Sequence, residues 1–336
     1  MTKKDFRGEV WNNVDEGVLA ELLRINAEPV DGKVGHDGYT ARATALLQSF
    51  FKKEIAVLYT VNGTAANVVA LKALLHRYGS VICAEQAHIH TYECGAVEYN
   101  LGNKILTART PDAKLTPARI ESVMQEHASH GFVFEVVALT EPTELGTLYT
   151  LDELRAIAEF AHEKGMRVFL DGARLGSALA SLGVTLTELI EGTGIDAFTV
   201  GGTKAGAMFG EAVVFTDKSL LCEGEYVLKQ SLQHFDKSKF LGAQMAYLLA
   251  DDRWVKNFSH ANEMATLLAR GLTKKGYALY LPVESNMVFC VMDEEALARA
   301  GAVYDLKYWF KEQKVVRIAT TFATKREDVE ALLALL

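Results

Sequence analysis

Several features that mark specialised classes of protein are scarce or missing in this sequence. Among its 336 residues there are five prolines and four cysteines, and no two cysteines form a CxxC pair. This cysteine usage indicates a reduced compartment. No apolar run approaches the roughly 20 residues of a membrane span, and residues 1–13 lack the apolar core of a signal peptide. We therefore expect a cytoplasmic protein with short connections between its elements.

Positive charge is also scarce. Lysine and arginine number 35 against 43 aspartates and glutamates, which gives a net charge of −8. Duplex nucleic acid and anionic membranes both select basic surfaces. We therefore expect neither of them as a partner.

Apolar residues are plentiful, and their pattern changes along the chain. They make up 49% of the sequence, and a length of roughly two times 150 residues predicts two domains. Short apolar runs separated by helical patterns predict strands at residues 55–60, 80–84, 132–140, 166–170, 196–200 and 211–215. Strands alternating with helices indicate an α/β fold with a mostly parallel sheet.

After residue 218 the pattern indicates a smaller α+β domain. Helices are predicted at residues 240–250, 255–275 and 326–336, and strands at 277–281, 286–292 and 315–320. We therefore expect an N-terminal segment (1–30), a large domain built on the parallel sheet (31–218) and a small C-terminal α+β domain (219–336).

Three loops that follow predicted strands carry unusual residues. Gly63 and Thr64 stand between a strand and a helix, where they could bind an anion or simply cap the helix. Asp171 ends a buried strand, where it could pair with Arg174 or hold a heteroaromatic nitrogen in its protonated form. Because ligands bind at the carboxyl ends of parallel strands, these loops mark a candidate site.

The third loop contains a lysine among glycines and small residues. Lys204 lies in the run VGGTKAG directly after a strand, where we expect the small residues to leave room for a bulky planar partner. Burial lowers the pKa of an amine, which suits Schiff-base chemistry. Such a lysine, a strand-end carboxylate and an anion-binding turn are what pyridoxal 5′-phosphate requires.

Longer runs carry a family resemblance. The segments TEPTELGTLYT, FLDGARLGSAL and FTVGGTKAGAMFGEAVVF resemble the threonine aldolase branch of the β-eliminating lyase family, in particular the low-specificity L-threonine aldolases. These are fold-type I pyridoxal-phosphate enzymes, so the resemblance implies their large parallel-sheet domain and smaller C-terminal domain. The match extends from about residue 6 to the C-terminus.

The resemblance implies which residues hold the cofactor. Lys204 would be the lysine that binds it covalently, and Asp171 would contact its pyridine nitrogen. Gly63 and Thr64 would hold the phosphate, and His88 would stack on the ring. No metal is expected.

It also implies which residues bind and convert the substrate. Arg174, which is expected beside the cofactor as well, and Arg317 would bind the substrate carboxylate, a task that suits a planar guanidinium. A histidine is the natural base for the β-hydroxyl proton, and His88 and His130 are the two candidates.

The implied reaction is retro-aldol cleavage of L-threonine or L-allo-threonine to glycine and an aldehyde. The alternatives within the enzyme class are a β-eliminating lyase and an aldolase for bulkier substrates such as phenylserine. A homodimer or homotetramer is implied as well. The sequence departs from the family pattern at several positions, among them His36 and Glu141. We expect these differences to affect which substrate is bound and to leave the cofactor site intact.

Two readings from other classes compete with this one. His88 and His90, with Glu93 and Cys94 nearby, could form the metal site of a hydrolase if a strand pointed both rings to one face. That reading leaves Lys204 unexplained. A non-catalytic protein that binds the cofactor is the second rival.

Overall fold

The large sheet contains the strands expected in the first two thirds of the chain. The computed structural model describes residues 5–29, 32–33 and 35–336. The strands of this sheet are β1 (Ala56–Thr60), β2 (Gly79–Ala84), β3 (Lys104–Ala108), β4 (Val133–Thr140), β5 (Arg167–Asp171), β6 (Ala197–Gly201) and β7 (Glu211–Phe215). They lie in the order β1-β7-β6-β5-β4-β2-β3, and neighbours are parallel except in the two pairs that involve β7. The expected α/β class with a mostly parallel sheet is confirmed.

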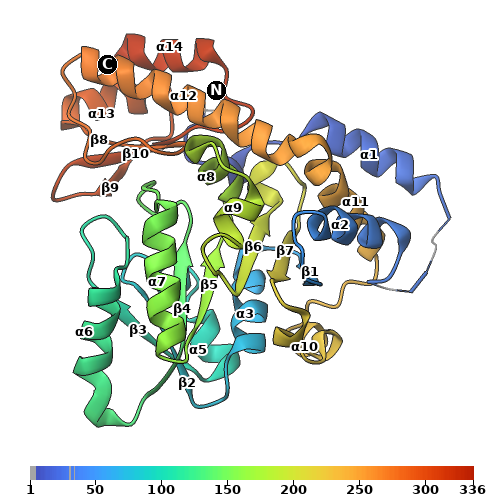
Figure 1. Cartoon of the computed structure of the whole chain (residues 1–336). Helices are drawn as coiled ribbons and strands as arrows, with labels where there is room; N and C mark the ends of the chain where they lie inside the picture. Colours follow the sequence, from blue (N-terminus) through green and yellow to red (C-terminus); the bar gives the residue numbers. More distant parts are fainter. Residues whose placement is uncertain (1–4, 30–31, 34) are drawn as a thin grey trace.

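Helices cover both faces of this sheet (Figure 1). The helices of this part are α1 (Glu16–Asn26), α2 (Gly38–Gln48), α3 (Gly63–Leu74), α4 (His88–Thr91), α5 (Ala96–Leu101), α6 (Pro117–His127), α7 (Leu151–Glu163), α8 (Leu175–Leu182), α9 (Leu186–Ile190), α10 (Gly224–Gln230) and α11 (Ser238–Leu249). One apolar core joins the sheet to α2, α6–α9 and α11, and a second joins it to α3, α5 and α10. Within the described part of the chain, no helix combines the length and apolar character that crossing a membrane requires.

The buried strands show why the strand ends are held firmly. In β5, Val168 and Leu170 enter one core while Phe169 enters the other, because successive side chains of a strand point to opposite faces. All three are fully buried. The next residue, Asp171, pairs with Thr140 and ends the strand at a fixed position.

The small domain is built on a second sheet. Its elements are α12 (Arg253–Lys274), β8 (Met287–Val291), α13 (Glu294–Gly301), β9 (Tyr308–Phe310), β10 (Val315–Ala319) and α14 (Arg326–Leu335). The antiparallel order is β8-β10-β9, and α12–α14 cover one face (Figure 1). The other face packs on Ala113 and Leu145 of the large domain. The two domains therefore meet at the loops that follow the large sheet.

The N-terminal segment packs with the small domain. Phe6 lies in the small-domain core, and its carbonyl accepts a hydrogen bond from the Ala319 N–H at 2.8 Å. The following 3-10 helix, η1 (Glu9–Trp11), contacts η3 (Thr203–Ala205) of the large domain. Residues 6–11 thus bridge the two domains.

One expected strand is wrong. Residues 277–281 form a single bridge, between Leu279 and Cys290, and the third strand of the small sheet is β9 instead. Residues 277–281 lie along the outer edge of β8, where the Tyr280 N–H donates to the Phe289 carbonyl at 2.8 Å and the Val291 N–H donates to the Ala278 carbonyl at 2.9 Å, but this pairing is too short to form a strand.

The domain boundaries remain predictions. The boundary at residues 30 and 31 lies outside the described residues. Beyond residue 218, α10 and α11 still pack in the cores of the large sheet.

Candidate active site

Several of the predicted site residues line one cavity at the carboxyl ends of the central strands. The cavity is lined by Gly63, Asn67, His88, Thr140, Pro142, Glu144, Asp171, Ala173, Arg174 and Lys204. These residues follow β1, β2, β4, β5 and β6, which is the edge where open parallel sheets bind ligands. The fold therefore brings Gly63, His88, Asp171, Arg174 and Lys204 together, while their chemical roles stay predictions.

Lys204 stands on η3, whose backbone is fixed from two directions. The Gly202 N–H is shared between the Gly210 carbonyl at 3.1 Å and Glu211 Oε2 at 3.0 Å, and Asn257 Nδ2 donates to the Ala205 carbonyl at 2.8 Å. Burial and the nearby Arg174 guanidinium lower the pKa of Lys204. The amine is thus held in place and pushed toward its neutral, nucleophilic form.

The glycines beside Lys204 serve close packing and do not clear space around the amine. A Cβ on Gly201 would lie 2.1 Å from the Ala173 carbonyl oxygen, and one on Gly202 would lie 2.4 Å from that of Gly210. Such distances are far below van der Waals contact. The expected reason for these glycines is therefore wrong, although the strand-end position of Lys204 is as predicted.

Asp171 is held by neutral donors. Its Oδ1 accepts the Ala173 N–H at 3.0 Å, and its Oδ2 accepts Asn67 Nδ2 at 2.9 Å. The structural alternative, an Asp171–Arg174 ion pair, is not formed. The carboxylate keeps its negative charge available to a cationic group in the cavity.

His88 belongs to the same polar network. Its Nδ1 lies 2.8 Å from Glu93 Oε1, which also accepts Asn67 Nδ2 at 2.7 Å. Burial alone would lower the pKa of His88, but the neighbouring carboxylates, first Glu93, raise it. Asn67 therefore links the histidine, through Glu93, to Asp171.

The start of α3 is suited to an anion. Asn62 caps the helix, because its side chain accepts the Ala65 N–H at 2.8 Å. Gly63 and Thr64 are therefore not the cap, and space is open where a Cβ on Gly63 would stand. Uncapped N–H groups and the positive helix end form a cradle for a phosphate.

Arg174 pairs with a residue from the N-terminal segment. Its Nε and Nη2 donate to Glu9 Oε1 and Oε2 at 2.7 and 3.2 Å, and Asn286 Nδ2 donates to Glu9 Oε1 at 2.7 Å. Arg174 and Glu9 are 8% and 4% exposed. Burial alone would lower the pKa of Arg174, but the Glu9 carboxylate raises it. Two guanidinium nitrogens are thus anchored in a side chain that lines the cavity.

Arg317 approaches the same place from the small domain. Its guanidinium carbon lies 4.6 Å from the centre of the Trp309 ring, and its Nη2 donates to the Arg7 carbonyl at 3.2 Å. Its buried Nε has no hydrogen-bond partner among the described residues. Burial and the positive charge of Arg174 lower its pKa. Two cations held this close favour an anionic ligand between them.

The fold of the single chain does not bring His130 to this cavity. His130 ends η2 (Ala128–His130) and is exposed, before the start of β4. The cavity lies past the other end of that strand, where Thr140 lines it, and an eight-residue strand extends over roughly 25 Å. His88 is therefore the histidine that this chain places in the cavity.

The geometry of a His-x-His metal site is not formed. His88 and His90 lie on the short helix α4 and not on a strand, so residues two apart point to different faces. His90 is exposed. No group of three or more His, Cys, Asp or Glu that could hold a metal occurs in the part of the chain that is described.

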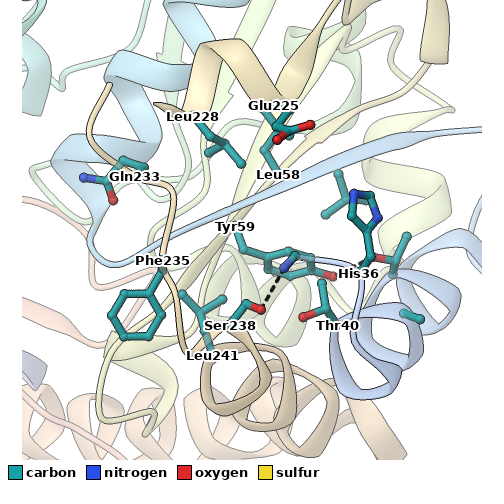
Figure 2. Close-up of a pocket in the computed structure, with 14 residues that line it drawn as sticks. His36, Thr40, Leu58, Tyr59, Glu225, Leu228, Gln233, Phe235, Ser238 and Leu241 are labelled. Carbon is teal, nitrogen blue, oxygen red and sulfur yellow. Dashed lines mark hydrogen bonds between the residues drawn. The ribbon is translucent and has the colours of Figure 1, made fainter. Parts of the chain in front are cut away.

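A separate cavity of about 410 Å³ contains none of the predicted site residues. Figure 2 shows His36, Tyr59 and Ser238 around it, contributed by the segment before α2, by β1 and by α11. The Gly35 N–H donates to Ser238 Oγ at 2.8 Å. His36, which departs from the family pattern, thus lies at this second cavity and not beside Lys204.

Sequence reasoning missed four polar residues of the candidate site. Asn67 and Glu93 connect Asp171 with His88, Glu9 anchors Arg174, and Glu144 lines the cavity. Asn67, in the first turns of an otherwise apolar helix, was a detectable signal. Glu144 stood four residues beyond a strand end, within a run that the family resemblance had already marked.

Comparisons with known proteins agree with this geometry. A β-eliminating lyase family model matches residues 19–295. The low specificity L-threonine aldolase of Pseudomonas aeruginosa is 40% identical over 322 residues, which cover 94% of this chain and 93% of that relative. One from a Pseudomonas species is 42% identical over 266 residues, covering 78% of this chain and 77% of that relative.

Solved structures extend the agreement to the fold. Leishmania major threonine aldolase superposes with a TM-score of 0.93 at 31% identity, covering 98% of both chains. Thermus thermophilus aspartate aminotransferase, at 18% identity and 99% coverage of this chain and 90% of that one, gives 0.73 and shares the fold alone. The expected fold-type I arrangement is confirmed, and the chain belongs to the β-eliminating lyase family.

Proposed function

We propose that this protein is a pyridoxal-phosphate-dependent aldolase that cleaves L-threonine or L-allo-threonine to glycine and an aldehyde. The observation that carries the proposal is the placement of Lys204, Asp171 and Arg174 around one cavity. The relatives named as low specificity L-threonine aldolases support the choice of substrate.

The residues of the cavity fit pyridoxal phosphate. Lys204 offers an amine of lowered pKa, Asp171 offers a carboxylate for the pyridine nitrogen, and the open, uncapped start of α3 at Gly63 and Thr64 offers donors to the phosphate. When bound, the cofactor supplies a conjugated ring that takes up the electron pair released as the substrate bond breaks.

The remaining side chains bind and orient the amino acid. Arg174, anchored by Glu9, and Arg317, held against Trp309, would bind the substrate carboxylate. Two planar cations fix both the position and the rotation of that group. His88, held by Glu93, would lie against the cofactor ring.

Products distinguish the aldolase from its alternatives. A β-eliminating lyase would release a 2-oxo acid and ammonia from the same substrate, and an aldolase for bulkier substrates would prefer phenylserine to threonine. A homodimer or homotetramer in the cytoplasm remains a prediction.

The test combines a spectrum with product analysis. Purified protein supplied with cofactor should show a visible absorption band that Lys204→Ala abolishes and the exposed control Lys53→Ala retains. Wild type should convert L-threonine or L-allo-threonine to glycine and aldehyde in equal amounts. A wild-type protein without the band, or one that releases a 2-oxo acid and ammonia, would overturn the proposal.

A further inference from the structure

Glu144 is a carboxylate of the cavity that the proposed roles do not use. It lies between Thr143 and Leu145, which are both buried, and it is itself half-buried at the cavity wall. The Thr143 N–H donates to the Thr147 carbonyl at 2.9 Å, and the hydroxyls of these threonines lie 2.6 Å apart. This tight loop fixes the backbone on both sides of Glu144, so its side chain is presented from a rigid support.

The carboxylate of Glu144 faces cations without binding any of them. Its negative charge acts on Lys204, Arg174 and Arg317. It makes no hydrogen bond or ion pair among the residues that the structure describes. In contrast, both oxygens of Asp171 accept hydrogen bonds from the protein. Glu144 is therefore available to a ligand.

The chemistry of the substrate leaves one group without a partner. In the proposed function, on which this inference rests, the arginines bind the carboxylate and the amine is joined to the cofactor. A β-hydroxy amino acid then still needs an acceptor for its hydroxyl proton. Among the cavity residues, His88 bonds to Glu93 through Nδ1 and is assigned to the cofactor ring, whereas Glu144 has no assigned role and both of its oxygens are unbound.

We propose that Glu144 accepts the β-hydroxyl proton during carbon–carbon cleavage. The O–H bond breaks and its proton passes to a carboxylate oxygen of Glu144. The hydroxyl oxygen becomes the carbonyl oxygen of the aldehyde as the Cα–Cβ bond breaks. A bound cofactor would take up the electron pair of that bond, and a proton returned to Cα would complete glycine.

The test compares Glu144→Gln and Glu144→Ala with an exposed control, Glu159→Gln on α7. We expect kcat for aldehyde release to fall roughly 10²- to 10⁴-fold in both Glu144 variants and to stay unchanged in the control. The Kd of glycine, which has no hydroxyl, should stay within about threefold of wild type when measured by titration of the visible absorption. Added formate should restore part of the rate to Glu144→Ala.

Two results would overturn the assignment. One is a Glu144→Gln variant that keeps the wild-type rate while His88→Asn loses it. The other is a loss of glycine affinity as large as the loss of kcat, without rescue by formate. A wild-type protein that yields no glycine and aldehyde would instead refute the proposed function, so the two failures are distinguishable.

Discussion

The two sides of the cavity are built in different ways. On the cofactor side, Asp171 ends a strand and Lys204 follows another strand of the same sheet, and neutral or backbone groups and side chains of the neighbouring elements support both. On the carboxylate side, Arg174 is held by Glu9 from the N-terminal segment, while Arg317 comes from the small domain. The reactive groups of the first side are placed by one sheet, whereas those of the second meet only when three distant segments are assembled.

The two sides of the cavity also differ in how their charged groups are paired. Asp171 is bonded to neutral donors and keeps its charge for a ligand. Arg174 shares its charge with Glu9 in a buried pair, and such a pair leaves an uncompensated charge when one partner is removed. Changes on the first side should therefore affect chemistry, and changes on the second should affect stability and substrate affinity.

The largest effect is expected on the cofactor side. Asp171→Asn removes the charge that would keep the pyridine nitrogen protonated, so we predict that kcat falls roughly 10²- to 10³-fold. Folding should lose only about 1 to 3 kcal/mol, because the Ala173 and Asn67 donors bond to different oxygens of Asp171 and the single amide oxygen of asparagine replaces one of those acceptors. Steady-state kinetics and thermal unfolding measure the two quantities.

The exposed substitution Asp152→Asn is the matched control and should leave both unchanged. A different result would contradict this prediction. If Asp171→Asn strongly lowered the free energy of unfolding but left kcat unchanged, the carboxylate would stabilise the fold rather than take part in the reaction, and the two sides of the cavity would not differ as proposed.

On the carboxylate side we predict a stability effect that depends on pH. Burial alone would raise the pKa of Glu9, but Arg174 overrides this and lowers it to about 2. A lowered carboxyl pKa stabilises the folded state above the unfolded value, and this contribution is lost as the pH falls toward 2. Glu9→Gln should therefore reduce the free energy of unfolding by about 3 kcal/mol at pH 7, and by less below pH 4.

Denaturant unfolding at several pH values provides the measurement. The exposed pair Arg299–Glu295 offers the control, because Glu295→Gln should cost less than about 1 kcal/mol. Equal losses in the two variants, or a loss in Glu9→Gln that does not shrink in acid, would show that the buried pair does not stabilise the fold.

The same contrast explains how much of the site the sequence could reveal. Asp171 and Lys204 were predicted because an ionisable residue directly after a buried apolar strand is visible in one local window. Glu9 was missed because 165 residues separate it from Arg174, and no local pattern reports such a contact. His130 precedes a strand, and the rule that places ligands at carboxyl ends already argued against it within one chain.

For the fold, six of the seven strands of the large sheet were predicted because each is a buried run bounded by turns and helices, whereas β3 was missed. The strand at residues 277–281 failed because its pairing with the edge of β8 is limited to a single bridge, which no pattern in its own sequence reports. The glycines near Lys204 were correctly seen as unusual, yet their close approach to Ala173 and Gly210 is a tertiary contact.

The smallest effect is expected at a second buried carboxyl, Glu141, which lies behind the cofactor side. We compare it with Glu9. Glu141 Oε2 accepts the Tyr149 N–H at 3.1 Å, but Oε1 has no partner among the described residues. Burial raises its pKa well above the ordinary value, because no cation forms an ion pair with it and the Tyr149 N–H and the charge of Lys114 offset only part of the effect. A raised carboxyl pKa destabilises the folded state above the unfolded value, and this penalty disappears as the pH falls below it.

Glu141→Gln should therefore increase the free energy of unfolding at pH 7, by about 1 kcal/mol, where Glu9→Gln decreases it. The difference in the free energy of unfolding between each variant and wild type should shrink in acid, because each wild-type carboxyl is then protonated in the unfolded chain. The difference should fall toward zero for Glu141→Gln and rise toward zero for Glu9→Gln. Denaturant unfolding of both variants at pH 7 and pH 4 gives the comparison. The comparison would fail if both variants had a lower free energy of unfolding than wild type at pH 7. Glu141 would then be stabilised by a bond that its raised pKa does not reflect, and an ion pair with a cation would not be what distinguishes the two buried carboxyls.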